Sequence, residues 1–165
     1  AWGVNFQRTV RRKNEESLWA GWQRTEGWRQ TSQFLSARMR AGDQLWCASG
    51  LVEGRGAELP LSEPLDRYLS FPLRGVYRVV DKSGESIEPR ALVGDGTNWA
   101  VQLRAAGRAS SSGSVVWIVY RGSPAAFDKH LRRLALQLEV GSLGHWRVGE
   151  PRAFGLVSVV EVRCD

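Results

Sequence analysis

Residues 115–119, which read Val-Val-Trp-Ile-Val, constrain the fold most, because five consecutive apolar side chains occur without alternating polar ones. A strand with one face in water alternates, whereas a strand covered on both faces does not. The run is also far shorter than the roughly 20 residues of a membrane-spanning helix. We therefore expect a central strand over 114–120, in a sheet that is covered on both sides.

A helix is expected directly after this strand, over residues 124–139. Ser123 suits the N-cap, and Pro124 suits the first helical position. Apolar residues then recur at helical spacing on one side of the helix, at Phe127, Leu131, Leu134, Ala135 and Leu138. This pattern is typical of a helix that packs on a sheet.

Several other segments have the composition of strands. An alternating pattern favours a strand over 2–10, and turn residues bound the remaining candidates. These further strands are expected at 45–52, 99–103, 146–148 and 156–162. The glycine-broken stretch 11–30 is expected to be irregular, and 33–40 fits either a short strand or a helix.

A β-hairpin is the clearest local prediction. Its two strands are expected at 75–81 and 87–93, with a turn at 82–84 in which Gly84 supplies a positive φ angle. The glycine-rich segment 94–98 is interpreted as a tight turn between strands, since it lacks the spaced acidic ligands of a calcium loop.

These elements predict a mostly β or α+β fold, an antiparallel sheet or sandwich with one principal helix near residues 124–139. A length of 165 residues suits a single domain over 1–165. The proline- and glycine-rich stretch leaves a boundary near 55–70 as an alternative.

Charge and the reactive side chains limit the function classes. The 23 basic against 17 acidic residues give a net charge of +6, which attracts anionic partners. Cys47 and Cys164 lack CxxC spacing, so no structural zinc site is predicted, and a disulfide and two thiols both remain open. His130 and His145 are the two histidines, and neither lies in an HExxH motif. We expect no metal, no cofactor and a non-catalytic protein.

The N-terminal segment carries a resemblance to a known family. It contains Trp2-Gly3-Val4-Asn5-Phe6, then Arg8, then the run 11–16 (Arg-Arg-Lys-Asn-Glu-Glu), then Trp19. Over residues 2–34 this order resembles the closing part of a family-nine-like carbohydrate-binding module, as found at the front of some large bacterial cell-envelope proteins. The resemblance implies a β-sandwich, aromatic rings that stack on sugars, and a location in the cell envelope or outside the cell.

The tryptophan-rich stretch supplies the candidate ligand site. A flat indole ring can cover the C–H face of a sugar while polar side chains bond its hydroxyls. Under this hypothesis Trp19, Trp22 and Trp28 stack on carbohydrate, and Asn14, Glu16 and Arg24 orient the hydroxyls. The same tryptophans equally fit core anchors with arginines stacked over them.

A basic cluster supports an alternative function. Arg8, Arg11, Arg12 and Lys13 are close in sequence and would hold phosphates or carboxylates. The alternative is a basic interaction domain that binds nucleic acid or an acidic protein. No zinc finger and no RNP-type aromatic motif accompanies the cluster.

Overall fold

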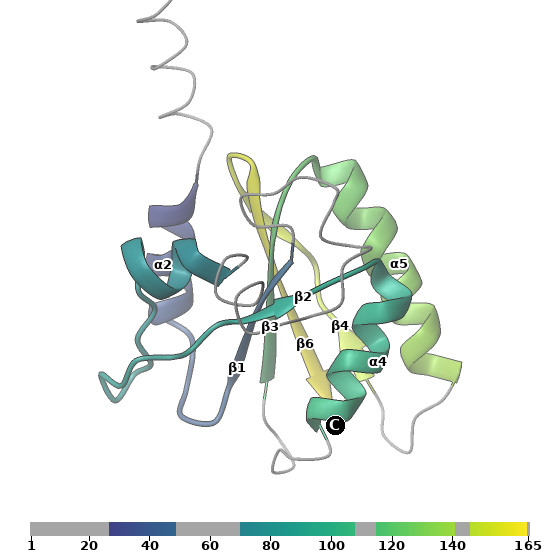
Figure 1. The fold of residues 1–165 in the computed structure, drawn as a ribbon, viewed down its shortest axis with the longest axis horizontal. Coiled ribbons are helices and arrows are strands. Elements are labelled where there is room, and N and C mark those ends of the chain that lie inside the picture. The colour runs from purple at the N-terminus through teal and green to yellow at the C-terminus, as the bar shows by residue number, and fades with distance from the viewer. Residues whose placement is uncertain (1–26, 49–69, 108–114, 141–145, 165) are drawn as a thin grey trace, which may run out of the picture.

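The computed structural model describes residues 27–48, 70–107, 115–140 and 146–164, which form an α+β fold around one six-stranded sheet (Figure 1). The elements in chain order are α2 (Trp28–Ser36), β1 (Gln44–Ala48), the π-helical turn η1 (Pro72–Val76), β2 (Arg90–Leu92), α4 (Gly96–Gly107), β3 (Val115–Arg121), α5 (Pro124–Val140), β4 (Trp146–Val148), β5 (Arg152–Phe154) and β6 (Val157–Cys164). The α+β class is confirmed, and the described strands form a single sheet rather than a sandwich.

The sheet is mixed. Its strand order is β2-β1-β3-β6-β4, with β5 also paired to β6. Strand β1 runs parallel to β2 and β3, whereas β6 runs antiparallel to β3, β4 and β5. The predicted central strand is confirmed as β3, which pairs on both edges.

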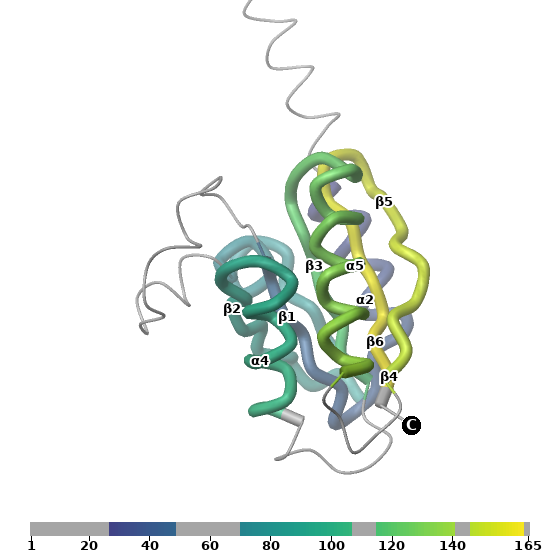
Figure 2. The backbone as a smooth tube through the Cα atoms, turned by 90° about the vertical axis from the view of Figure 1, so that its right-hand side faces the viewer, coloured from purple at the N-terminus to yellow at the C-terminus, as the bar shows by residue number. Residues whose placement is uncertain are grey.

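Helices cover both faces of the sheet, with α4 and α5 on one side and α2 on the other (Figures 1 and 2). Val116 and Ile118 of β3 pack in the core under α4 and α5, and Trp117 and Val119 pack in the core under α2. A strand clamped in this way has no polar face, which explains the unbroken apolar run in the sequence. Within the described ranges, no helix combines the length and the apolar character needed to cross a membrane.

The helix predicted over 124–139 is confirmed as α5. The hydroxyl oxygen of Ser123 accepts a hydrogen bond from the backbone N–H of Ala126 at 3.2 Å, the geometry of an N-cap. The predicted stripe is the buried side, formed by Phe127, Leu131, Leu134 and Leu138.

The strand predicted at 99–103 is wrong, because these residues lie inside α4. A carboxylate oxygen of Asp95 accepts the N–H groups of Thr97 at 2.9 Å and Asn98 at 3.4 Å, so the expected turn at 94–98 leads into a helix instead of a strand. Trp99 and Leu103, four residues apart, are then both buried at helical spacing.

The predicted hairpin is correct only at its turn. Gly84 has φ +89°, and one bridge joins Val80 to Ser86. Residues 72–76 instead form η1, and β2 pairs in parallel with β1. Pro89 has no N–H to donate to a ladder, which works against a long second strand at this point.

Some of the remaining predictions can be compared with the structure, and the others fall on residues that it does not describe. The helical alternative for 33–40 is the one observed, since α2 ends at Ser36, and β1 occupies the start of 45–52. The strands expected at 146–148 and 156–162 are confirmed as β4 and β6. The strand at 2–10, residues 11–26 and nearly all of the boundary region 55–70 lie outside the described residues. Residues 28–30, expected to be irregular, instead form the start of α2.

A β-bulge divides the edge strand that lies along β6 (Figure 2). Val148 pairs with Val162, the N–H of Gly149 bonds the carbonyl of Glu161 at 2.8 Å, and Arg152 pairs with Val159. Residues 150 and 151 therefore lie opposite one residue of β6. The extra residue shifts the alternation of side chains between the two faces of the sheet by one position. Val148 therefore packs toward α5, while Arg152 and Phe154 lie on the face that carries α2.

Candidate functional site

One of the six predicted carbohydrate contacts, Trp28, lies in the part of the chain that the structure describes. The others, Asn14, Glu16, Trp19, Trp22 and Arg24, lie outside it, as do the predicted anion contacts Arg8, Arg11, Arg12 and Lys13. Their roles in ligand binding therefore remain predictions from the sequence.

Trp28 is a core residue, with 2% of its surface exposed. It is on the buried side of α2 together with Thr31, Ser32 and Leu35, at helical spacing. The helix begins close to the edge strand, because a Cβ on Gly27 would lie 1.7 Å from the carbonyl oxygen of Phe154. The buried ring of Trp28 is not available to stack on a sugar, so Trp28 is a core anchor rather than a ligand contact.

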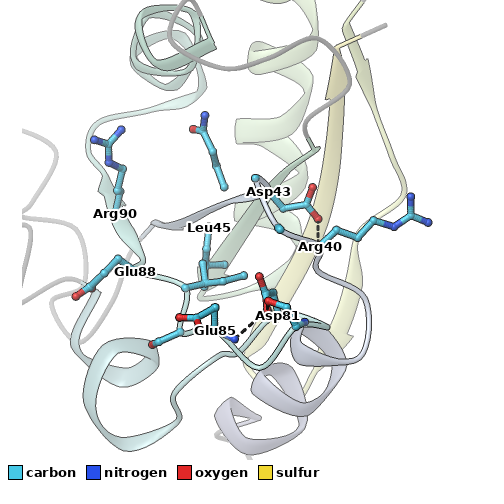
Figure 3. A pocket seen from close by; sticks show the side chains of 13 residues that line it. Arg40, Asp43, Leu45, Asp81, Glu85, Glu88 and Arg90 are labelled. Carbon is cyan, nitrogen blue, oxygen red and sulfur yellow. Dashed lines mark hydrogen bonds between the residues drawn. The ribbon is translucent and has the colours of Figure 1, made fainter.

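The described residues enclose an open pocket of about 510 Å³ at the amino end of β1 (Figure 3). The loop before β1, the turn after residue 80 and the start of β2 form its walls. Its charged side chains are Arg40, Asp43, Asp81, Glu85, Glu88 and Arg90. Figure 3 shows Asp43 and Asp81 on one side of the pocket and Glu88 and Arg90 on the other.

Asp81 shapes one wall. Its Oδ1 accepts the hydroxyl of Ser83 at 2.5 Å and the backbone N–H groups of Ser83 at 2.8 Å and Glu85 at 3.0 Å. The Ser83 hydroxyl and these amides lower the pKa of Asp81 against the opposing effect of burial. This carboxylate is therefore ionised at neutral pH and holds the turn that carries Glu85.

Asp43 lies on the same side of the pocket as Asp81 and ties this side to the central strand. Its Oδ2 accepts the backbone N–H of Arg40 at 2.9 Å and the indole N–H of Trp117 at 3.4 Å, and its Oδ1 accepts the N–H of Val115 at 3.2 Å. Residues more than 70 positions apart are thus joined at the rim of the pocket.

Some of the remaining charged side chains interact with other residues of the protein, and others do not. Glu88 pairs with Arg74 at 2.8 Å, and the guanidinium of Arg90 lies 5.5 Å from the ring centre of Trp46. The exposed Glu85 and Arg40 side chains make no ion pair with another described residue, so both can turn toward a ligand. Ile87 adds a half-buried apolar surface to the lining.

The pocket offers hydrogen-bond donors and acceptors around a small apolar surface. Carboxylates accept, guanidinium groups donate, and the hydroxyls of Ser83 and Ser86 line the same space. This arrangement suits a polar, uncharged ligand with many hydroxyls. Within the described ranges, no three His, Cys, Asp or Glu side chains are grouped to hold a metal ion.

Sequence reasoning missed this pocket, although it located one part of it. The Asp-Lys-Ser-Gly sequence of residues 81–84 identified the turn. What brings the turn to the start of β1 is tertiary: Lys82 donates its backbone N–H to the carbonyl of Met39 at 3.2 Å, and Ser36 accepts the N–H of Val80 at 3.1 Å. No local pattern signals such contacts.

A second polar cluster lies between α4 and α5. The Asp95 carboxylate that caps α4 also pairs with Arg133 at 2.5 Å. His130 stacks on Trp99 with 4.8 Å between ring centres, and burial lowers the pKa of this histidine despite the neighbouring Asp95 charge. Capping accounts for Asp95, and stacking accounts for the position of the His130 ring.

Comparisons with protein-family models, with curated proteins and with solved structures found no match to this chain.

Proposed function

We propose that this chain is a non-catalytic binding module for carbohydrate and that the pocket at the start of β1 is a site for the sugar. The observation that carries the proposal is the lining of the pocket, in which hydrogen-bond donors and acceptors occur together with the half-buried apolar side chain of Ile87. Sugars combine hydroxyls that both donate and accept with an apolar C–H surface, so they match such a lining.

The size of the pocket agrees with this ligand class. About 510 Å³ falls within the range of roughly 300–1,000 Å³ for small-ligand sites, which is enough for one or two sugar rings. Its opening to solvent allows a longer chain to continue outward. Glu85 and Arg40 are the groups that we expect to contact hydroxyls directly.

The resemblance over residues 2–34 supports the same ligand class from a different part of the chain. Under that resemblance Trp19 and Trp22 stack on sugar rings, while Asn14, Glu16 and Arg24 orient the hydroxyls. Trp28 is excluded from this set by its burial. A place in the bacterial cell envelope or outside the cell is part of the same proposal.

A glycan array probed with the purified chain at low and at high salt tests the class of ligand. We expect binding to a defined group of neutral glycans that changes little with salt, because hydroxyl contacts carry no net charge. The absence of any glycan signal, or a signal confined to acidic glycans at low salt, contradicts the proposal.

Two matched variants test the position of the site. Glu85→Ala removes an exposed carboxylate from the pocket, and Glu139→Ala removes one from α5, far from it in sequence. We expect Glu85→Ala to weaken glycan binding about tenfold, as for the loss of a charge-assisted hydrogen bond, and Glu139→Ala to leave it unchanged. Equal binding by both variants would place the site elsewhere.

A further inference from the structure

A second surface, on the side of the sheet that carries α2, combines arginines with aromatic rings. The guanidinium carbon of Arg38 lies 4.0 Å from the ring centre of Phe34, and that of Arg152 lies 5.0 Å from the same centre. Phe154 packs against Phe34 with 5.2 Å between ring centres. We call Phe34, Arg38, Arg152 and Phe154, together with the neighbouring Arg147 and Arg163, the arginine face.

The β-bulge places Arg152 on the same side of the sheet as Arg147, which precedes the bulge. Arg147 is directly opposite Arg163, and Arg152 is opposite Val159. Val159 and Arg163 are four residues apart along β6, so they share a face at a separation of roughly 13 Å. The arginine face is thus long enough to meet more than one charged group of a polymer.

Among the described residues, not every arginine of this face has an acidic partner. Arg163 pairs with Glu161 at 2.5 Å. Arg38 and Arg152 are exposed, and neither forms an ion pair with a carboxylate of the residues that the structure describes. The aromatic ring beneath them fixes both guanidinium groups in position while leaving their N–H edges to solvent.

We propose that the arginine face binds single-stranded nucleic acid. A guanidinium held over an aromatic ring presents donors for a phosphate at its edges and a flat cationic surface for a base. The half-buried rings of Phe34 and Phe154 add apolar area for stacking. The function is separate from the carbohydrate pocket and uses different residues.

The stacked geometry favours a nucleic acid over an acidic peptide. Carboxylates of a peptide would satisfy the positive charge, but they have no flat ring to place against the guanidinium and phenyl surfaces. Bases have such a face, and strands without a fixed sequence bind to surfaces of this kind.

Fluorescence anisotropy with a labelled 20-residue oligothymidylate tests the proposal on the full chain. We expect the double variant Arg38→Gln/Arg152→Gln to bind at least about tenfold more weakly at low salt. The slope of log K against log salt should become shallower by about 1.4, which is about 0.7 for each lost phosphate contact. Arg132→Gln, on the outer side of α5, is a charge control that removes one arginine and should change each quantity by less than half as much.

Two further probes separate stacking from charge. An abasic oligomer of the same length carries the phosphates without bases. We expect it to bind at least about fivefold more weakly than oligothymidylate, since it lacks the rings that stack on this surface. Phe34→Leu should reduce that preference. Equal binding of the abasic oligomer, stronger binding of a polyglutamate peptide, or equal loss in the double variant and the Arg132 control would each overturn the proposal.

Discussion

The indole N–H of Trp117 donates a hydrogen bond to Oδ2 of Asp43 over 3.4 Å, although the two residues are 74 positions apart. Asp43 lines the pocket, and the Trp117 ring also packs edge-on with the Phe34 ring, with ring centres 6.0 Å apart. The wall of the pocket and the support of the arginine face therefore rest on the same strand, β3. The two proposed sites are distinct in their ligands but share this framework.

Asp43→Ala is expected to destabilise the fold by about 1–3 kcal/mol. The substitution leaves the N–H groups of Val115 and Trp117 without their acceptor, and an unsatisfied buried donor costs that amount. Urea denaturation followed by circular dichroism measures the change. Asp128→Ala removes a carboxylate from an exposed i, i+4 ion pair on α5 and should cost about 0.5 kcal/mol or less. Equal effects for the two variants would contradict the role of Asp43.

Gly27→Ala is expected to destabilise the protein by at least about 1–3 kcal/mol, because the new Cβ would lie 1.7 Å from the carbonyl oxygen of Phe154. The clash cannot be relieved by a side-chain rotation, since the obstacle is the backbone of Phe154. Thermal unfolding with and without the substitution measures the cost. Gly42→Ala meets no atom within 4 Å and carries only the strain of φ +91°, about 1–2 kcal/mol. A smaller loss of stability for Gly27→Ala than for Gly42→Ala would show that the start of α2 is not closely packed against β5.

Deletion of Glu150 is expected to disrupt the edge strand, since it removes the extra residue of the bulge. Arg152 and Phe154 would then alternate in phase with Val148 and turn away from α2. Losing the packing of Phe154 on Phe34 should cost about 2 kcal/mol or more. Glu150→Ala keeps the residue count and should change stability by less than about 0.5 kcal/mol. A deletion that is tolerated as well as the substitution would refute the bulge as a register device.

Acid is expected to weaken the fold through Asp81. The Ser83 hydroxyl and the turn amides hold its folded pKa below the value in the unfolded chain, about 3.9. The stabilisation is therefore present above about pH 4 and is lost as the pH falls through the lower, folded pKa. Urea denaturation at pH 7, 5, 4 and 3 should show a smaller acid loss for Asp81→Asn than for the unsubstituted chain. Parallel pH profiles would contradict this account.

The central strand and the last helix were predictable because their signals are local. An apolar run without alternation identified β3, and Ser123-Pro124 followed by a stripe at helical spacing identified α5. Residues 99–103 show the limit of that approach. Their mostly apolar sequence fits a strand, but the cap at Asp95, fixed by its hydrogen bonds and by Arg133, starts a helix.

The candidate sites depended on contacts that no segment reveals by itself. The pocket forms where the turn at 81–84 meets the loop before β1, and the arginine face forms where α2 crosses β5. The tryptophan pattern predicted a ligand role for Trp28, yet position on the inner side of α2 decided its burial. Composition alone could not distinguish a ring in the core from a ring on the surface.

The most direct test of the central claim is a ¹H–¹⁵N NMR titration of the labelled chain with the glycan that binds best on the array. We predict that the largest shift changes occur at the turn 81–87 and the loop 40–45 and that Glu85→Ala weakens binding without altering the spectrum elsewhere. Shift changes that spare both segments would contradict the claim that this pocket holds the sugar.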